Sequence, residues 1–391
     1  MGNFTDKLKS VKWKNYVNYI AVAIVAVVFG ALSMASALPA STIYLLEKIA
    51  ISIILAVSLS LVVGFLGELS LGHAGFMCVG AYLGGKVAAL LAKTALGGVG
   101  KGILVLIIAL VVGGACAGIC GFIVGLPALR LKGDYLAIVT LAFGEIVKVI
   151  FQNTSKESFG GPIGLPTPRF DKKYLFIIGF LMVLLTLAVI QNLIKSKHGR
   201  AITAIRDNEI AAKSTGINVT KYKLTGFIIA AVFAGFAGVI FSYSQNNVSS
   251  NTFDYNYSIE ILVMVVLGGM GSINGSIISA TLITFLNVQL QNVLKGDLAV
   301  LKDLIYALIL ILLVIYNNAP ALKSFREKYN LRNLMQKIIK PKHDPSRIRD
   351  DTARWDVVPT KISMDEVLST DVVIDNTGDN SADIGERGGN K

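Results

Sequence analysis

The sequence predicts an all-α protein, a polytopic bundle of about ten transmembrane helices with both termini in the cytoplasm. Hydrophobic residues make up 53% of the 391 residues and the mean hydropathy is +0.63, which is too apolar for a chain that folds in water. Apolar runs of the roughly 17 to 25 residues that cross a bilayer recur along the chain. Lys and Arg gather mainly in the short segments between these runs.

Ten apolar runs are expected to form the spans, although the eighth is too short to cross comfortably. The first run follows a Lys-rich start that resembles a signal peptide. Its length and the apolar segment after it indicate an uncleaved span, with a cleaved signal peptide as the alternative. The runs cover 20–38, 43–66, 71–92, 103–129, 135–151, 174–194, 222–243, 258–269, 276–293 and 298–316.

Orientation follows from the basic residues, because positively charged loops stay in the cytoplasm. An even number of crossings puts both termini on one side. The strongly basic segments fall on that side: the N-terminus, Arg130 with Lys132, 195–223 and the tail from Lys323. The formal net charge of +12 is therefore interpreted as membrane topology, with lipid and not nucleic acid as the partner. The outer connections, two of which carry Lys, would be 39–42, 93–102, 152–173 and 244–257.

Three regions are expected: a basic cytoplasmic N-terminus at 1–19, a transmembrane domain at 20–316 with a cytoplasmic loop at 195–221, and a cytoplasmic tail at 317–391. Beyond Pro341 the tail is rich in Asp, Ser, Asn and Gly, and it has too few apolar residues to bury a core. This part is therefore predicted to be disordered. Docking of Trp355 on a partner is the alternative.

The inventory of reactive residues does not favour an enzyme. The chain has three histidines and no Cys/His cluster with metal-ligand spacing, so no catalytic, cofactor or metal site is expected. The glycines of 97–102 resemble a phosphate-binding loop. The loop lacks its upstream Gly, and Gly102 stands where Ser or Thr would bind magnesium. The chain is not expected to hydrolyse ATP by itself.

Small residues at four-residue spacing predict close contact between helices in lipid. Ionisable residues inside spans are costly, and they are usually paired or facing water. Glu145 and Lys148 lie on one helix face, so they form either an ion pair or part of a pathway or gate. Glu260 and Lys86 are expected to snorkel from the outer ends, and His73 is either a hydrogen-bonding packing residue or part of the pathway. The small-residue pairs are Gly80 with Gly84, Gly114 with Gly118, and Ala117 with Gly121.

Two glycine-rich segments interrupt the apolar pattern. In 153–168, glycines and prolines forbid a continuous helix and predict an ordered external loop or a plain connector. The glycines of 268–275, beginning with Gly268 and Gly269, predict a tight inner turn between two spans. The alternative is a broken helix that lines a substrate pathway.

The cytoplasmic segment 195–218 has the pattern of a short helix. Asp207 or Asn208 can cap a helical turn over 210–214, and Gly216 can end it in a left-handed conformation. Such a helix could insert into a groove of a partner protein, or the segment could be a solvated connector.

The residues 199–217 contain Gly-Arg-Ala, then Ala-Ile-Arg-Asp-Asn-Glu-Ile-Ala-Ala, then Gly-Ile. This pattern resembles the coupling loop of ABC transporter permeases of the LivM type, which belong to branched-chain amino acid importers. Further motifs at 69–76, 133–146, 160–161 and 267–275 resemble those of the family in the expected order. Together they cover about 43–316.

The resemblance implies a multi-pass permease subunit of the cytoplasmic (inner or plasma) membrane of a prokaryote, importing leucine, isoleucine or valine. Its implied partners are a second permease subunit of the LivH type, two ATPase subunits of the LivG and LivF type that bind ATP and Mg, and an extracytoplasmic amino-acid-binding protein. The residues implied to couple to the ATPases are Arg206, Glu209, Ala211, Ala212 and Gly216. Ile210 stands where the generic importer pattern has Glu, so generic geometry is not carried over unchanged.

Three other functions stay open at this stage. Urea and short-chain amide permeases of the same family look much alike in sequence. An ion-coupled secondary transporter would account for Glu145 and Lys148 but not for the coupling-like loop. A passive channel is compatible with the glycine-rich helices.

Overall fold

The computed structural model describes residues 17–34, 39–92, 102–131, 133–168, 172–245, 247–294 and 301–318. The Lys-rich segment 1–16, the glycines of 97–100 and the tail from 319 onward, with its predicted disorder, lie outside the described residues.

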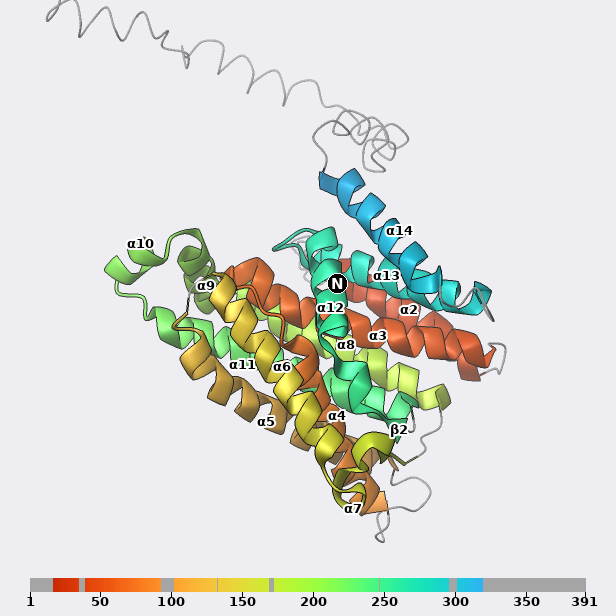
Figure 1. The fold of residues 1–391 in the computed structure, drawn as a ribbon. Helices are drawn as coiled ribbons and strands as arrows, with labels where there is room; N and C mark the ends of the chain where they lie inside the picture. Colours follow the sequence, from red (N-terminus) through yellow and green to blue (C-terminus); the bar gives the residue numbers. More distant parts are fainter. Residues whose placement is uncertain are drawn as a thin grey trace, which may run out of the picture. The chain divides into compact units, whose positions relative to one another are not determined.

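Helices occupy every one of the predicted apolar runs within the described residues (Figure 1). Six segments are long and apolar enough to cross a membrane, which confirms the helical membrane bundle in its coarse form. They are Ala40–Leu66, His73–Ala92, Gly102–Ala128, Tyr174–Lys195, Val219–Gln245 and Ile273–Val293. The helices are α2 (Val17–Met34), α3 (Ala40–Ser60), α4 (His73–Ala92), α5 (Gly102–Ala128), α6 (Asp134–Asn153), α8 (Lys172–Lys195), α11 (Val219–Gln245), α12 (Tyr255–Gly268), α13 (Ile273–Val293) and α14 (Leu301–Asn318).

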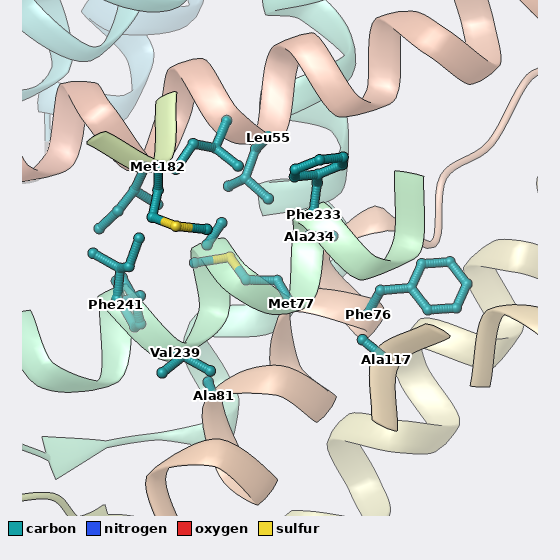
Figure 2. Packing of buried hydrophobic residues seen from close by; sticks show 14 of the residues in the cluster. Leu55, Phe76, Met77, Ala81, Ala117, Met182, Phe233, Ala234, Val239 and Phe241 are labelled. Carbon is teal, nitrogen blue, oxygen red and sulfur yellow. The ribbon is translucent and has the colours of Figure 1, made fainter. Parts of the chain in front are cut away.

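Helix α3 is enclosed by protein. Every residue from Ile49 to the end of its π-helical extension η2 (Leu61–Leu66) is buried, against α8, α11, α12 and α13. A helix that is apolar on all sides belongs inside a bundle. Figure 2 shows part of the resulting core, to which α3 contributes Leu55, α4 Met77, α8 Met182 and α11 Phe233 and Ala234.

Helices α4, α5 and α11 pack with their backbones in close contact. At Gly80 an added Cβ would collide with the backbone of Gly235, and at Gly84 it would lie 2.9 Å from the Ala109 carbonyl oxygen. Ala117 fills the space beside Gly235. The predicted role of the small-residue pairs as close helix contacts is therefore confirmed for these positions.

The segment predicted as an external loop or connector is an ordered loop. It contains α7 (Lys156–Phe159), the short 3-10 helix η4 (Gly161–Ile163) and strand β1 (Leu165–Pro166). β1 pairs antiparallel with β2 (Asn247–Val248), which is followed by η5 (Ser250–Phe253). Two of the predicted outer connections thus lie against each other, and in Figure 1 α7 and β2 lie at the end of the bundle opposite to α10.

The glycine break at 268–275 is a tight turn between α12 and α13, as the first of its two readings predicted. Gly269 and Gly271 have φ of 89° and 82°, and Ser272 caps α13 by accepting from the Gly275 amide. Gly268 packs against Gly275, and Ser279 donates to the Met264 carbonyl oxygen. The two helices therefore run antiparallel from this turn.

We expect Gly80→Ala to lower the unfolding free energy by about 1–3 kcal/mol, because its methyl group has no space beside Gly235. The matched control is Gly30→Ala in α2, where the nearest atom would be 3.9 Å away. Thermal unfolding in detergent, followed by size-exclusion chromatography, measures both. Equal loss of stability in the two variants would contradict the close contact.

Candidate functional site

The cytoplasmic loop predicted from the sequence folds into two short helices, α9 (Lys197–Asp207) and α10 (Glu209–Ser214). Ser196 caps α9 by accepting from the amides of His198 and Gly199. Asn208, one of the two predicted caps, accepts from the Ala211 amide at 3.0 Å and begins α10. The loop is therefore not a structureless connector.

Gly216 ends α10 as predicted, with φ of +83°. Its amide bonds to the Lys213 carbonyl oxygen, and the Ile217 amide bonds to the Ala212 carbonyl oxygen. These two bonds form a Schellman motif, which requires a left-handed residue where Gly216 stands. The turn fixes where α10 stops and α11 begins.

Helix α9 packs on the π-helical end of α3. Ile202 is buried in a cluster with Leu61, Phe65 and Leu66. Helix α9 is thus attached to the central helix of the bundle through apolar contact as well as through a hydrogen bond.

Arg206 bonds to the backbone at the end of this π-helix. Its Nη1 donates to the Gly64 carbonyl oxygen at 3.0 Å, and its Nε and Nη2 donate to Asp207. Gly67 has φ of +75°, and an added Cβ there would meet the Arg206 side chain at 2.8 Å. A cation at a helix C-terminus satisfies free carbonyl groups and complements the helix dipole.

The turn between α12 and α13 meets the same point. An added Cβ at Gly64 would collide with the Gly271 amide, and one at Gly271 would lie 3.5 Å from Arg206 Nη1. Arg206 therefore lies where α9, the end of α3 and the turn at Gly269–Gly271 come together.

Lys223, in the first turns of α11, binds two carboxylates. Its Nζ lies 2.5 Å from Glu68 Oε1 and 3.0 Å from Glu209 Oε2. The side chains of Lys223 and Glu68 are 7% and 11% exposed, whereas that of Glu209 is 40% exposed. Glu209 also stands at the first residue of α10, where a negative charge favours the helix dipole. This ion triad joins α10, α11 and the segment after the π-helix.

The five predicted coupling residues therefore divide into two groups. Arg206 and Glu209 bond to the bundle, and Ala212 is the buried residue of α10. Ala211 and Gly216 are exposed. Sequence reasoning did not single out Ile210 as a contact residue, although it is 78% exposed at the surface of α10.

The three ionisable residues predicted for a pathway each have a partner in the bundle. His73 is buried with its Nε2 2.8 Å from Ser58 Oγ on α3, the arrangement of a hydrogen-bonding packing residue. Glu145 and Lys148 form the expected ion pair at 3.1 Å, and Glu145 also accepts from the Tyr255 amide at the start of α12. Gly268 and Gly269 belong to the turn near Arg206. Their role in a pathway stays a prediction.

A polar cavity of about 140 Å³ lies among α3, α11, α12 and α13, and sequence reasoning missed it. Glu260 lines this cavity and accepts from Asn287 Nδ2 at 2.9 Å and Tyr306 Oη at 2.8 Å. The prediction that Glu260 snorkels is wrong, because these bonds hold the carboxylate inside the bundle. The only signal in the sequence was the presence of Lys48 and Glu260 in apolar runs.

We expect Lys223→Met to cost roughly 1–3 kcal/mol of stability, because Glu68 would be left as a buried, unpaired charge. This is below the cost of a fully buried pair, since Glu209 is 40% exposed. The control replaces all three charges together, as Glu68→Gln, Lys223→Met and Glu209→Gln, and should recover most of the loss. Thermal unfolding in detergent measures the stability of both variants. A triple variant no more stable than Lys223→Met would argue against the triad.

Residues 41–315 match the family model described as branched-chain amino acid transport system / permease component. The chain is 36% identical over 315 residues to the high-affinity branched-chain amino acid transport system permease protein LivM of Escherichia coli (strain K12), covering 72% of this chain and 70% of that protein. It is 40% identical over 265 residues to the protein of the same name from Salmonella typhimurium, covering 60% of each chain.

A probable branched-chain amino acid transport permease protein LivH of Methanocaldococcus jannaschii is 29% identical over 161 residues, covering 41% of this chain and 47% of that protein. No solved structure matches. The family model begins at the start of α3 and ends within α14, so it includes the ion triad, α9, α10 and the turn at Gly269–Gly271. The chain therefore belongs to the family of permease components of branched-chain amino acid transport systems.

Proposed function

We propose that this protein is a permease subunit of an ABC importer that moves leucine, isoleucine or valine across the cytoplasmic membrane of a prokaryote. ATP hydrolysis would take place on partner subunits, so the chain is a transport subunit and not an enzyme. One observation carries the proposal beyond family membership: a capped helix, α10, presents an exposed Ile210 while Arg206 and Glu209 bond its surroundings to the bundle.

The proposed topology has ten crossings with both termini in the cytoplasm. Two sets of contacts support it. Arg206, in the predicted inner segment 195–223, bonds to Gly64 near the predicted inner end of the span 43–66. β1 and β2 pair from predicted outer connections. Each set is drawn from one side of the predicted membrane, as this topology requires.

The proposed partners are a second permease subunit of the LivH type, two ATPase subunits of the LivG and LivF type carrying ATP and Mg, and an external amino-acid-binding protein. Relatives named LivM and LivH support a transporter with paired permease subunits. In this assembly α10 would lie in a groove of an ATPase subunit, with Ile210 inserted and Ala211 and Gly216 at the contact.

Coupling would then follow the polar bonds of this surface. A displacement of α10 reaches α11 through Glu209 and Lys223, and it reaches the end of α3 through Arg206 and the Gly64 carbonyl group. Because α3 contacts α8, α11, α12 and α13, a movement at its cytoplasmic end is passed to most of the bundle. ATPase closure would in this way switch the spans between outward and inward access.

The ion-coupled alternative is less well supported by the geometry. It would use Glu145 and Lys148 as ion-binding groups, but these two side chains pair with each other and Glu145 caps α12. The urea and short-chain amide alternative shares the proposed architecture, so it is separated from the amino acid reading by the choice of ligand.

The substrate is tested with the complex reconstituted in liposomes together with its binding protein. We expect leucine to stimulate ATP hydrolysis and ATP-dependent uptake, whereas urea leaves both at the level without ligand. Stimulation by urea alone would overturn the substrate class. Gradient-driven uptake by the isolated chain would overturn the ABC importer itself.

The coupling surface is tested with Ile210→Asp. A charge at the centre of an interface should reduce copurification of the ATPase subunits and stimulated ATP hydrolysis by roughly tenfold or more. Thermal stability should be unchanged, since the side chain is 78% exposed. Ile210→Leu is the matched control and should retain both activities. Full activity of Ile210→Asp would argue against α10 as the docking helix.

A further inference from the structure

The polar cavity among α3, α11, α12 and α13 has the composition of a ligand site. Two charged side chains line it, Lys48 from α3 and Glu260 from α12. Lys48 follows Ala40, the first residue of α3, by eight residues, which is about 12 Å along a helix. In the proposed topology the cavity therefore lies in the outer part of the membrane, on the side from which the substrate arrives.

The two charges face the same cavity without pairing. The structure gives Lys48 no carboxylate within 4.0 Å among the described residues, and its ammonium group lies 5.1 Å from the centre of the Tyr44 ring. Asn287 and Tyr306 both donate to the same oxygen of Glu260, Oε1. Separate opposite charges inside a membrane bundle are costly unless each has a partner. Neither charge meets an opposite charge among the described residues, since Glu260 accepts from two neutral groups and Lys48 lies over the Tyr44 ring. A molecule with both a carboxylate and an ammonium group supplies the opposite charge for each.

The rest of the lining is apolar on one part and neutral polar on another. Ile51, Phe241, Met264 and Val288 provide a surface for an aliphatic side chain. A volume of about 140 Å³ is close to that of a cavity known to hold a benzene-sized molecule, so it suits a small ligand. A nucleotide or a peptide would be too large.

A hydroxyl group in the wall has no protein partner. Thr284 is 5% exposed, and its Oγ1 lies buried without a hydrogen bond among the described residues. Buried polar groups are normally bonded, so an unbonded hydroxyl beside a cavity indicates a group that enters it.

We propose that this cavity binds a zwitterionic amino acid with a short aliphatic side chain, Lys48 holding its carboxylate and Glu260 its ammonium group. Thr284 adds a hydrogen bond, and the apolar wall receives the side chain. The inference rests on the proposed function for the identity of its ligand, and it adds a binding site within this subunit on the transport route.

The test measures binding of radiolabelled leucine to the complete transporter in nanodiscs, without the binding protein and without ATP. Two competitors remove one charge each: leucinamide lacks the carboxylate and 4-methylpentanoate lacks the ammonium group. We expect leucine to bind, and both competitors to bind at least tenfold more weakly.

Single variants then assign each charge. Lys48→Gln should weaken leucine binding at least tenfold and abolish the preference for leucine over leucinamide. Glu260→Gln keeps an acceptor for Asn287 and Tyr306, and it should abolish the preference over 4-methylpentanoate. Thr284→Val should weaken binding severalfold without lowering thermal stability, since its hydroxyl has no partner to lose. The matched control is Lys86→Gln. Lys86 lies near the predicted outer end of α4, outside the cavity, and it donates to the backbone carbonyl oxygen of Glu157.

The outcomes separate this inference from the proposed function. If leucine does not bind without the binding protein, or if both variants keep the wild-type preferences, the cavity is not a substrate site. ATP-driven leucine uptake with the binding protein, measured on the same preparation, reports the proposed function independently. The site would be established if Lys48→Gln loses only the preference for leucine over leucinamide, Glu260→Gln loses only the preference over 4-methylpentanoate, and Lys86→Gln binds like the wild type.

Discussion

Close backbone contact between α4, α5 and α11 is the constraint on which the rest of the structure depends. In hydrocarbon, each helix satisfies its own backbone groups, and association must come from packing and not from the hydrophobic effect. Glycines at the contact positions let the three helices approach until side chains of one touch the backbone of another. The enclosed α3 lies against α11, and Lys223 of α11 forms the ion triad with Glu68 and Glu209.

The end of the bundle that carries α9 and α10 combines two kinds of attachment. The apolar cluster around Ile202 holds α9 on the π-helix. Arg206 bonds the end of α9 to the Gly64 carbonyl oxygen, and Lys223 binds Glu209 at the start of α10. Apolar contacts tolerate sliding, whereas hydrogen bonds to a single carbonyl oxygen do not. The Arg206 bond therefore restricts sliding of α9 along the end of α3, while Ile210 on α10 is exposed.

Much of the fold could be predicted from the sequence, because the bilayer imposes a length and an apolar composition on every crossing. The start of α10 at Asn208 and its end at Gly216 were predictable for a local reason, because each depends only on residues within one helical turn. The triad was not, because Glu68 and Lys223 are far apart in the chain and carry no shared pattern. The Glu260 network and the cavity were missed likewise, since the network joins three helices and the cavity lies among four.

The apolar composition of α3 is not explained by its final surroundings. Its sequence is about as apolar as that of α5, although α5 leaves a face exposed and α3 leaves almost none. Enclosed by protein, α3 could carry more polar residues without meeting hydrocarbon. A spanning helix must first be stable alone in lipid before its neighbours assemble around it. The apolar composition of α3 is thus the one that crossing lipid alone requires, and burial among its neighbours does not by itself require it.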